Sequence, residues 1–229
     1  ENGICYIFGA GSNTGSNPSD GAIFLDVAAN PINPVYLGEW DDEYIHDGMA
    51  RGDTMYAGCI NTGDLYIVDV SNKSNPVTIG THQTPNAFTH NAWVSDDGNY
   101  VFTTDEKSDA YIGSYDISDM SNIQEIDRIQ SNPESNSIPH NTHVDGNFLI
   151  TSWYRDGTIV HDISNPHNLV QVAYYDSYSG SGDGFDGCWG TYPFLPSGNI
   201  ISSEINSSSN QSAKLMIYER GFVQACYLE

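Results

Sequence analysis

Short apolar runs separated by turn residues dominate the chain, and residues 138–175 show this pattern most clearly. Their apolar and polar positions roughly alternate, and Gly, Asn, Asp and Pro divide them into four runs: Ile138–Val144, Phe148–Ser152, Thr158–Ile163 and Leu169–Tyr175. Short alternating runs with this punctuation predict β-strands. We find no convincing run with the period of an amphipathic helix. The sequence therefore predicts an all-β protein in which helix is scarce.

The same four-run unit recurs along the chain. Its third run ends in an acidic residue, which is found at Asp26, Asp69, Asp116, Asp162 and Glu219. The successive spacings of 43, 47, 46 and 57 residues suit a four-stranded propeller blade. We therefore predict a single β-propeller domain over residues 1–229, with about five blades at 1–42, 43–85, 86–133, 134–178 and 179–229.

The first predicted blade is incomplete. Its runs Ile4–Phe8, 21–27 and Val35–Trp40 correspond to the second, third and fourth strands of the unit, and no first strand precedes them. The run Phe222–Leu228 resembles the last strand of the fourth blade and would complete the fifth. An open arc of blades leaves strand edges exposed. We therefore expect either a three-stranded first blade or a chain that is part of a longer propeller.

The first run of the unit carries a polar residue at one equivalent position in four blades. Aligning these runs puts the following residues in register: His46, His90, His140 and Asp186. The first strand of a blade lines the central channel, so these side chains should converge at one level. Imidazoles combined with a carboxylate suit zinc, copper, iron or nickel, and Asp47, Asn91 and Asn141 could orient such ligands. The alternative is a structural hydrogen bond to the backbone that each blade repeats.

Acidic residues just after the second strand would lie at the mouth of the channel. These residues are Asp105, Glu106 and Glu204. Carboxylates at a propeller axis can perform acid and base chemistry on glycosides, and the alternative is that they are solvated loop acids.

Among the other histidines, His143 is assigned to packing. Structural or solvated positions are assigned to His82, His161 and His167.

The charge of the chain restricts its partners. Seven Lys and Arg stand against 30 Asp and Glu, which gives a formal net charge of −23 at pH 7. Such a surface repels nucleic acid and anionic lipids, and no apolar run is long enough for membrane insertion. The acids either keep the protein soluble or partly bind cations. For calcium the candidates are Asp183 and Asp186 among the glycines of residues 180–187, although a full calcium-loop ligand series is missing.

Composition also bears on the compartment. An acidic β protein rich in Tyr, Asn and Ser is most easily placed outside the cytoplasm, as an extracellular, cell-surface or periplasmic protein. Its four cysteines permit three fully paired disulfide connectivities: Cys5, Cys59, Cys188 and Cys226. The chain has no G-x-S-x-G elbow, H-E-x-x-H motif or phosphate-cradling glycine loop, so serine hydrolysis and nucleotide binding are unsupported.

Two sets of segments carry a family resemblance. Three segments resemble the LVIVD repeat: residues 21–38, 63–80 and 157–178. Three further segments follow one another in an order similar to that of bacterial proteins of the choice-of-anchor B type: residues 89–106, 138–157 and 185–204. The resemblance implies an extracellular or surface-attached β-propeller without an assigned catalytic activity. Some relatives pair the cysteine matching Cys59 with a cysteine in the loop at 9–21, which this chain lacks.

Together these observations favour a binding or scaffold module for a protein or glycan ligand, with a candidate transition-metal site at the axis. The alternative is a metal-dependent or carboxylate-based enzyme, such as a glycan-active hydrolase or lyase or an oxidase, that uses the same axial residues.

Overall fold

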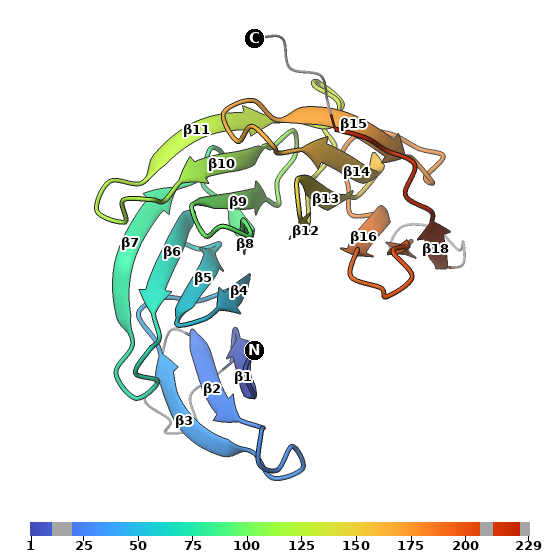
Figure 1. Ribbon diagram of the computed structural model, residues 1–229. Helices are drawn as coiled ribbons and strands as arrows, with labels where there is room; N and C mark the ends of the chain where they lie inside the picture. Colours follow the sequence, from blue (N-terminus) through green and yellow to red (C-terminus); the bar gives the residue numbers. More distant parts are fainter. Residues whose placement is uncertain (11–19, 207–212, 225–229) are drawn as a thin grey trace.

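The computed structural model describes residues 1–10, 20–206 and 213–224, and these residues form 18 β-strands and no helix. The strands build five antiparallel sheets, which follow one another around an arc as the blades of a propeller (Figure 1). The predicted all-β propeller is confirmed. None of the described residues belongs to a helix that could span a membrane.

The strands follow the chain in order within each blade. Blade one contains β1 (Ile4–Phe8), β2 (Ala22–Asp26) and β3 (Val35–Trp40). Blade two contains β4 (Asp47–Arg51), β5 (Thr54–Cys59), β6 (Asp64–Asp69) and β7 (Val77–Gln83). Blade three contains β8 (Thr89–Val94), β9 (Tyr100–Asp105), β10 (Ile112–Asp116) and β11 (Gln124–Ile129).

Blade four contains β12 (Thr142–Asp145), β13 (Phe148–Trp153), β14 (Gly157–Asp162) and β15 (Val170–Tyr175). Blade five contains β16 (Gly187–Tyr192), β17 (Ile200–Ile205) and β18 (Lys214–Tyr218). The first strands β4, β8, β12 and β16 face the inside of the arc, and β3, β7, β11 and β15 form its outer rim (Figure 1). Blade one lacks a first strand among the described residues, which agrees with the incomplete first blade that the sequence predicts.

The acidic residue that closes the third strand has the same structural role in blades one to four. Its carboxylate accepts a hydrogen bond from the backbone N–H two residues later, at 2.8 to 2.9 Å, for Asp26, Asp69, Asp116 and Asp162. Each third strand also contains a β-bulge against the fourth. Asp is well suited to this turn because its short side chain bonds its own backbone. Part of the negative charge therefore shapes the blades.

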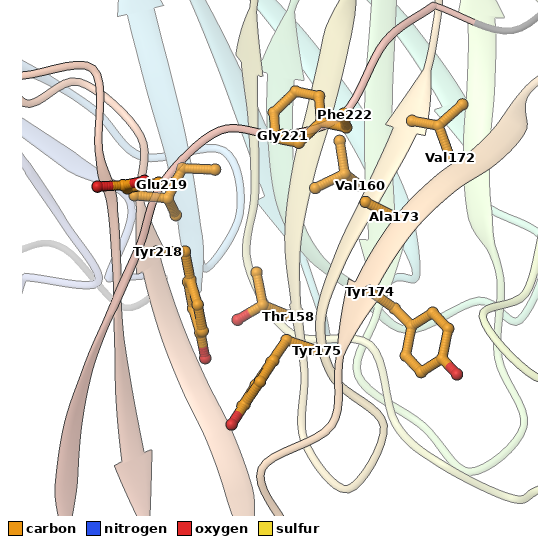
Figure 2. Close-up of a pocket in the computed structure, with 11 residues that line it drawn as sticks. Thr158, Val160, Val172, Ala173, Tyr174, Tyr175, Tyr218, Glu219, Gly221 and Phe222 are labelled. Atoms are coloured by element: carbon orange, nitrogen blue, oxygen red, sulfur yellow. The ribbon is translucent and has the colours of Figure 1, made fainter.

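The outer edge of blade five differs from the prediction. The described part of the expected fourth strand, residues 222–224, pairs with no strand, and residues 225–229 lie outside the described part of the chain. Phe222 instead packs on Phe148 of blade four, with ring centroids 4.8 Å apart. A groove of about 260 Å³ lies between the two blades, beside the rings of Tyr175 and Tyr218 (Figure 2). On β18, Leu215 and Ile217 are exposed.

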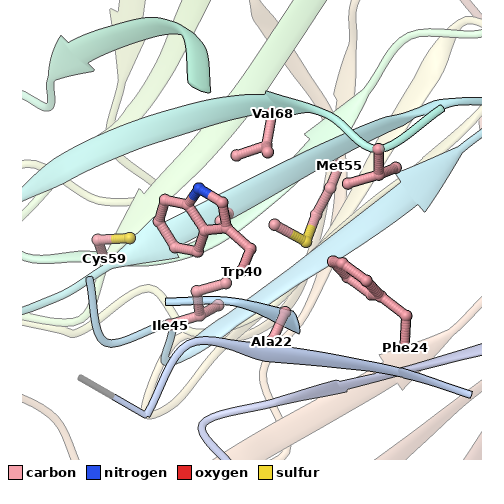
Figure 3. Close-up of a cluster of buried hydrophobic side chains, with 9 residues drawn as sticks. Ala22, Phe24, Trp40, Ile45, Met55, Cys59 and Val68 are labelled. Atoms are coloured by element: carbon pink, nitrogen blue, oxygen red, sulfur yellow. The ribbon is translucent and has the colours of Figure 1, made fainter. Parts of the chain in front are cut away.

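The hydrophobic core lies between neighbouring blades. At the first interface Phe24 of blade one faces Met55 and Val68 of blade two, and all three side chains are fully buried (Figure 3). The Trp40 indole joins them and donates a 3.1 Å hydrogen bond to the Thr78 hydroxyl of blade two. Because the apolar residues sit between blades, their packing sets how each inner strand lies relative to the next.

The cysteines form none of the three fully paired connectivities that the sequence permits. Cys5, Cys59 and Cys188 are free, and each of those connectivities needs one bond among these three. Cys226 lies outside the described residues.

Candidate metal centre

A cavity of about 460 Å³ opens at the inner ends of blades two to five. Its walls are formed by His46, Asp47, His90, Glu106, His140, Asn141, Tyr154 and Trp189. The three axial histidines stand in a row, with ring centroids 4.4 Å apart between His46 and His90 and 4.3 Å apart between His90 and His140. The structure thus brings together the three histidines that the repeat aligns.

Backbone pairing at the start of each inner strand places these rings. The N–H of His46 donates to the carbonyl of Gly58, and that of His140 donates to Ser152, both at 2.9 Å. His90 lies within β8, at a register shift in the pairing with β9. Since each blade repeats nearly the same backbone path, equivalent side chains arrive at one level of the arc.

Asn91 connects the blades beneath the histidines. Its side-chain N–H₂ donates a 3.0 Å hydrogen bond to Asp47 of blade two, and its side-chain oxygen accepts one of 3.2 Å from the Thr142 N–H of blade four. Burial raises the pKa of Asp47, and the hydrogen bond from Asn91 is the largest effect that opposes this rise. Asn91 therefore fixes a carboxylate beside the cavity and ties three blades together.

Glu106 supplies the carboxylate of the site. Its Oε2 lies 3.6 Å from Nε2 of His90, and its Oε1 lies 3.6 Å from Nε2 of His140. One ligand atom from each of His46, His90 and Glu106 falls within 4.8 Å of the others. Two imidazoles and one carboxylate are a donor set that catalytic zinc sites use, with a further position left open.

Burial keeps the inner histidines neutral. It lowers the pKa of His90 to about 2, with further lowering by His140 and His46, and it lowers the pKa of His140 to about 4. Burial also raises the pKa of Glu106, against the opposing effects of Tyr154 and His46. The 3.6 Å contacts between Glu106 and the rings are therefore not ion pairs at neutral pH, and the imidazole nitrogens remain available as ligands.

Several polar atoms of the cavity walls have no partner among the described residues. They are Nδ1 of His90, Nδ1 of His140 and Oδ1 of Asn141, all buried from solvent. Buried polar atoms are normally hydrogen-bonded, so these three atoms leave hydrogen-bonding capacity for a further group such as water.

Asp186 lies outside the lining of this cavity. Its carboxylate, 1% exposed, forms an ion pair of 2.9 Å with Nη2 of Arg155, whose guanidinium lies over the ring of Tyr178. The positive charge of Arg155 beside Asp186 also opposes a calcium ion there, while Asp183 is exposed. The repeat gave no signal for Arg155, which belongs to the turn after β13.

Of the three acids expected at the channel mouth, only Glu106 lines the cavity. Asp105 is fully buried and accepts hydrogen bonds from the Thr84 hydroxyl and from the backbone N–H groups of Asn86 and Phe88. Glu204 is buried in β17, with Lys214 at 3.9 Å. Asp105 therefore holds a loop in place, while Glu204 lies between strands of blade five.

Sequence reasoning missed two aromatic residues of the site. The Tyr154 hydroxyl donates a 2.7 Å hydrogen bond to Oε1 of Glu106, and burial raises the pKa of Tyr154. Trp189 of β16 packs its ring 5.4 Å from the ring of His140. Tyr154 follows β13 just as Glu106 follows β9. The repeat could have revealed Tyr154, had residues other than acids been considered at that position.

Comparison with known proteins agrees with this architecture. Residues 56–84, which run from β5 to just past β7, match the family model of the LVIVD repeat. A solved β-propeller domain from Myceliophteria thermophila superposes with a TM-score of 0.57 at 10% identity, covering 80% of this chain and 60% of that one. The chain is a repeat β-propeller.

Two bacterial structures resemble the propeller over most of its length. A periplasmic gluconolactonase from Pseudomonas aeruginosa gives a TM-score of 0.66 at 15% identity, covering 94% of this chain and 68% of that one. A protein from Lactobacillus plantarum gives 0.65 at 13% identity, covering 97% and 67%. At such low identity these likenesses show the fold. No curated protein sequence matches the propeller.

Proposed function

We propose that this propeller is a ligand-binding module that holds a transition-metal ion at its axis through His46, His90 and Glu106. The observation that carries the proposal is the convergence of ligand atoms from these three residues within 4.8 Å of one another. Zinc, copper, iron and nickel all accept imidazole nitrogen and carboxylate oxygen. His140, which contacts the same carboxylate, is the fourth candidate ligand.

Electrostatics supports a cation at this place. The inner histidines are neutral because of burial, so they offer lone pairs without repelling a metal ion. Among the described residues, no lysine or arginine lines the cavity. A bound cation would favour the ionised form of Glu106, whose pKa burial raises.

The location that we propose is outside the cytoplasm, at the cell surface, in the periplasm or in the medium. The net charge of −23 and the resemblance to surface proteins of the choice-of-anchor B type support this. The structural likeness to a periplasmic gluconolactonase is compatible with it. The ligand would be a glycan or another protein.

Elemental mass spectrometry of the purified protein tests the metal centre. We expect near-stoichiometric zinc, copper, iron or nickel, and its loss in His90→Ala and in Glu106→Gln. His161→Val is the matched control, because His161 is a buried histidine of β14 that does not line the cavity. Absence of metal from the wild-type protein, even after dialysis against each ion, would refute the proposal.

Metal-assisted hydrolysis is the second candidate function, and the Tyr154–Glu106 hydrogen bond favours it. A metal ion lowers the pKa of bound water, and a neighbouring carboxylate can accept its proton. The gluconolactonase likeness suggests glucono-δ-lactone as a first substrate. The metal-loaded protein should then hydrolyse it faster than the metal-free protein, and faster than Tyr154→Phe reloaded to the same metal content, because that variant keeps the proposed ligands and loses only the hydrogen bond to Glu106. Equal rates would argue against metal-assisted hydrolysis, and ligand binding would remain as the proposed function.

A further inference from the structure

We propose that the cavity binds the face of a neutral sugar ring, which stacks on Trp189 while its hydroxyl groups point toward Glu106, Asn141 and the metal ion. This inference rests on the metal centre proposed above and specifies its ligand class. It is carried by an exposed aromatic wall that adjoins a cavity whose described lining contains carboxylates and no lysine or arginine.

The aromatic wall, defined as Trp189 and Phe185, is exposed where side chains of this size are usually covered. Trp189 is 48% exposed on the inner strand β16, and Phe185 is 49% exposed just before that strand. Trp189 lines the cavity, and Phe185 packs edge-on against Tyr154, which also lines it, at 5.3 Å between ring centroids. Exposed aromatic side chains beside a cavity are characteristic of binding sites.

The rest of the cavity offers hydrogen-bond acceptors. Glu106 and Asp47 contribute carboxylate oxygens, and Asn141 adds an amide side chain to the lining. Acceptors of this kind need donors from the ligand. Hydroxyl groups supply such donors and can also coordinate a metal ion through oxygen.

Charge restricts the ligand to a neutral one. The lining residues include carboxylates, while no described lysine or arginine lies among them, and Arg155 next to Tyr154 is already paired with Asp186. A divalent ion at the centre would be balanced by the carboxylates of Glu106 and Asp47, so a phosphorylated, sulfated or uronic sugar would add a negative charge that no described lysine or arginine of the lining compensates.

A flat indole beside hydrogen-bonding groups is complementary to a pyranose ring. Such a ring has one face of C–H groups, which packs on an indole, and a rim of hydroxyl groups, which donate and accept hydrogen bonds. A volume of about 460 Å³ lies within the usual range for small-molecule sites, so one terminal sugar residue of a glycan can enter. The ring of Trp189 is held on its inner side by His140.

Calorimetric titration of the metal-loaded full chain tests the proposal. The probes are glucose, galactose, mannose and N-acetylglucosamine, with glucuronic acid and glucose 6-phosphate as their charged counterparts. We expect at least one neutral sugar to bind and to quench tryptophan fluorescence, and the charged sugars to bind more weakly. Trp189→Ala should weaken binding by about tenfold or more, and Trp189→Phe should recover part of it.

Two controls separate this inference from the metal centre. Tyr174→Ala removes an exposed ring, 69% exposed, from the groove between blades four and five and should leave sugar affinity unchanged. Metal content should be equal in Trp189→Ala and the wild type. A metal-loaded protein that binds no neutral sugar, or binds it equally well after Trp189→Ala, would overturn the sugar proposal while leaving the metal centre intact. Sugar binding that needs Trp189, in a protein that takes up no metal after dialysis against each ion, would overturn the metal centre and support the aromatic wall.

Discussion

Tyr154 of blade four donates a 2.7 Å hydrogen bond to Glu106 of blade three, and both residues directly follow the second strand of their blade. The hydroxyl meets Oε1, the same oxygen that contacts His140. The carboxylate is thereby held between two blades with Oε2 directed toward His90. Hydrogen bonds of this kind orient metal ligands and raise metal affinity.

Tyr154→Phe should therefore lower metal affinity about 10- to 100-fold without unfolding the protein. Competition with a chromogenic chelator measures the affinity, and near-ultraviolet circular dichroism checks the fold. Tyr175→Phe, which removes the hydroxyl of a half-exposed tyrosine outside the cavity, serves as the matched variant. Equal affinities in both variants and the wild type would show that the hydroxyl does not orient Glu106.

Asn91→Ala should destabilise the fold by about 2 kcal/mol, because it removes both inter-blade hydrogen bonds and leaves the half-buried Asp47 carboxylate without its amide donor. Urea denaturation at neutral pH gives the free energy of unfolding. Asn99→Ala, at an exposed turn of the same blade, should cost much less. If the two variants unfold at the same urea concentration, Asn91 does not tie the blades together.

His161→Val should stabilise the protein. His161 is fully buried and its two ring nitrogens have no partner among the described residues, whereas Val68 fills the equivalent place of blade two. An unsatisfied buried polar group costs about 1–3 kcal/mol, which the valine would avoid. A lower midpoint of urea denaturation for the variant at pH 7.5 would contradict this.

The same residue makes stability depend on pH. Burial lowers the pKa of His161 from its ordinary value of about 6.5 to about 3. Between these values the unfolded chain binds a proton that the folded chain does not, so stability falls as pH falls through this window. His161→Val removes this contribution, and its advantage over the wild type should grow by roughly 1.4 kcal/mol for each pH unit below 6. An advantage that is constant between pH 7.5 and pH 5 would exclude this origin.

Arg155→Met should strongly destabilise the folded protein, because it leaves the buried Asp186 carboxylate without its cation. Breaking one side of a buried ion pair costs about 3–5 kcal/mol. The double variant Arg155→Met, Asp186→Asn should recover part of the loss, since it removes the buried charge as well. Thermal unfolding of both variants measures the difference. A double variant no more stable than the single one would mean that packing of Arg155 against Tyr178 dominates.

The repeat carried enough information to bring His46, His90 and His140 together, because equal positions in a repeated blade have equal depth and direction. It failed for Asp186, since the guanidinium of Arg155 comes from a turn whose residues vary between blades. The repeat also could not show which of the two neighbouring acids, Asp105 or Glu106, lines the cavity. Neighbouring residues at the end of a strand point to opposite sides, and only the structure shows that Asp105 faces its own loop.

The strand pattern predicted blades one to four because each apolar run buries a face against the next blade. Blade five was less predictable at Phe222–Leu228. An apolar run can satisfy the same burial against a neighbouring blade without pairing, as Phe222 does against Phe148. Trp189 was visible in the sequence, but its exposure depends on what lies opposite it, which no local pattern encodes.

The core between the blades gives the arc its curvature, and the candidate ligands come from three successive blades. The ligand atoms of His46, His90 and Glu106 lie within 4.8 Å of one another, and this separation depends on the angle between blades two and three. The angle between the blades thus sets how many of these side chains can reach one ion. A bound ion would restrain that angle from inside the arc, and the core between the blades restrains it from outside.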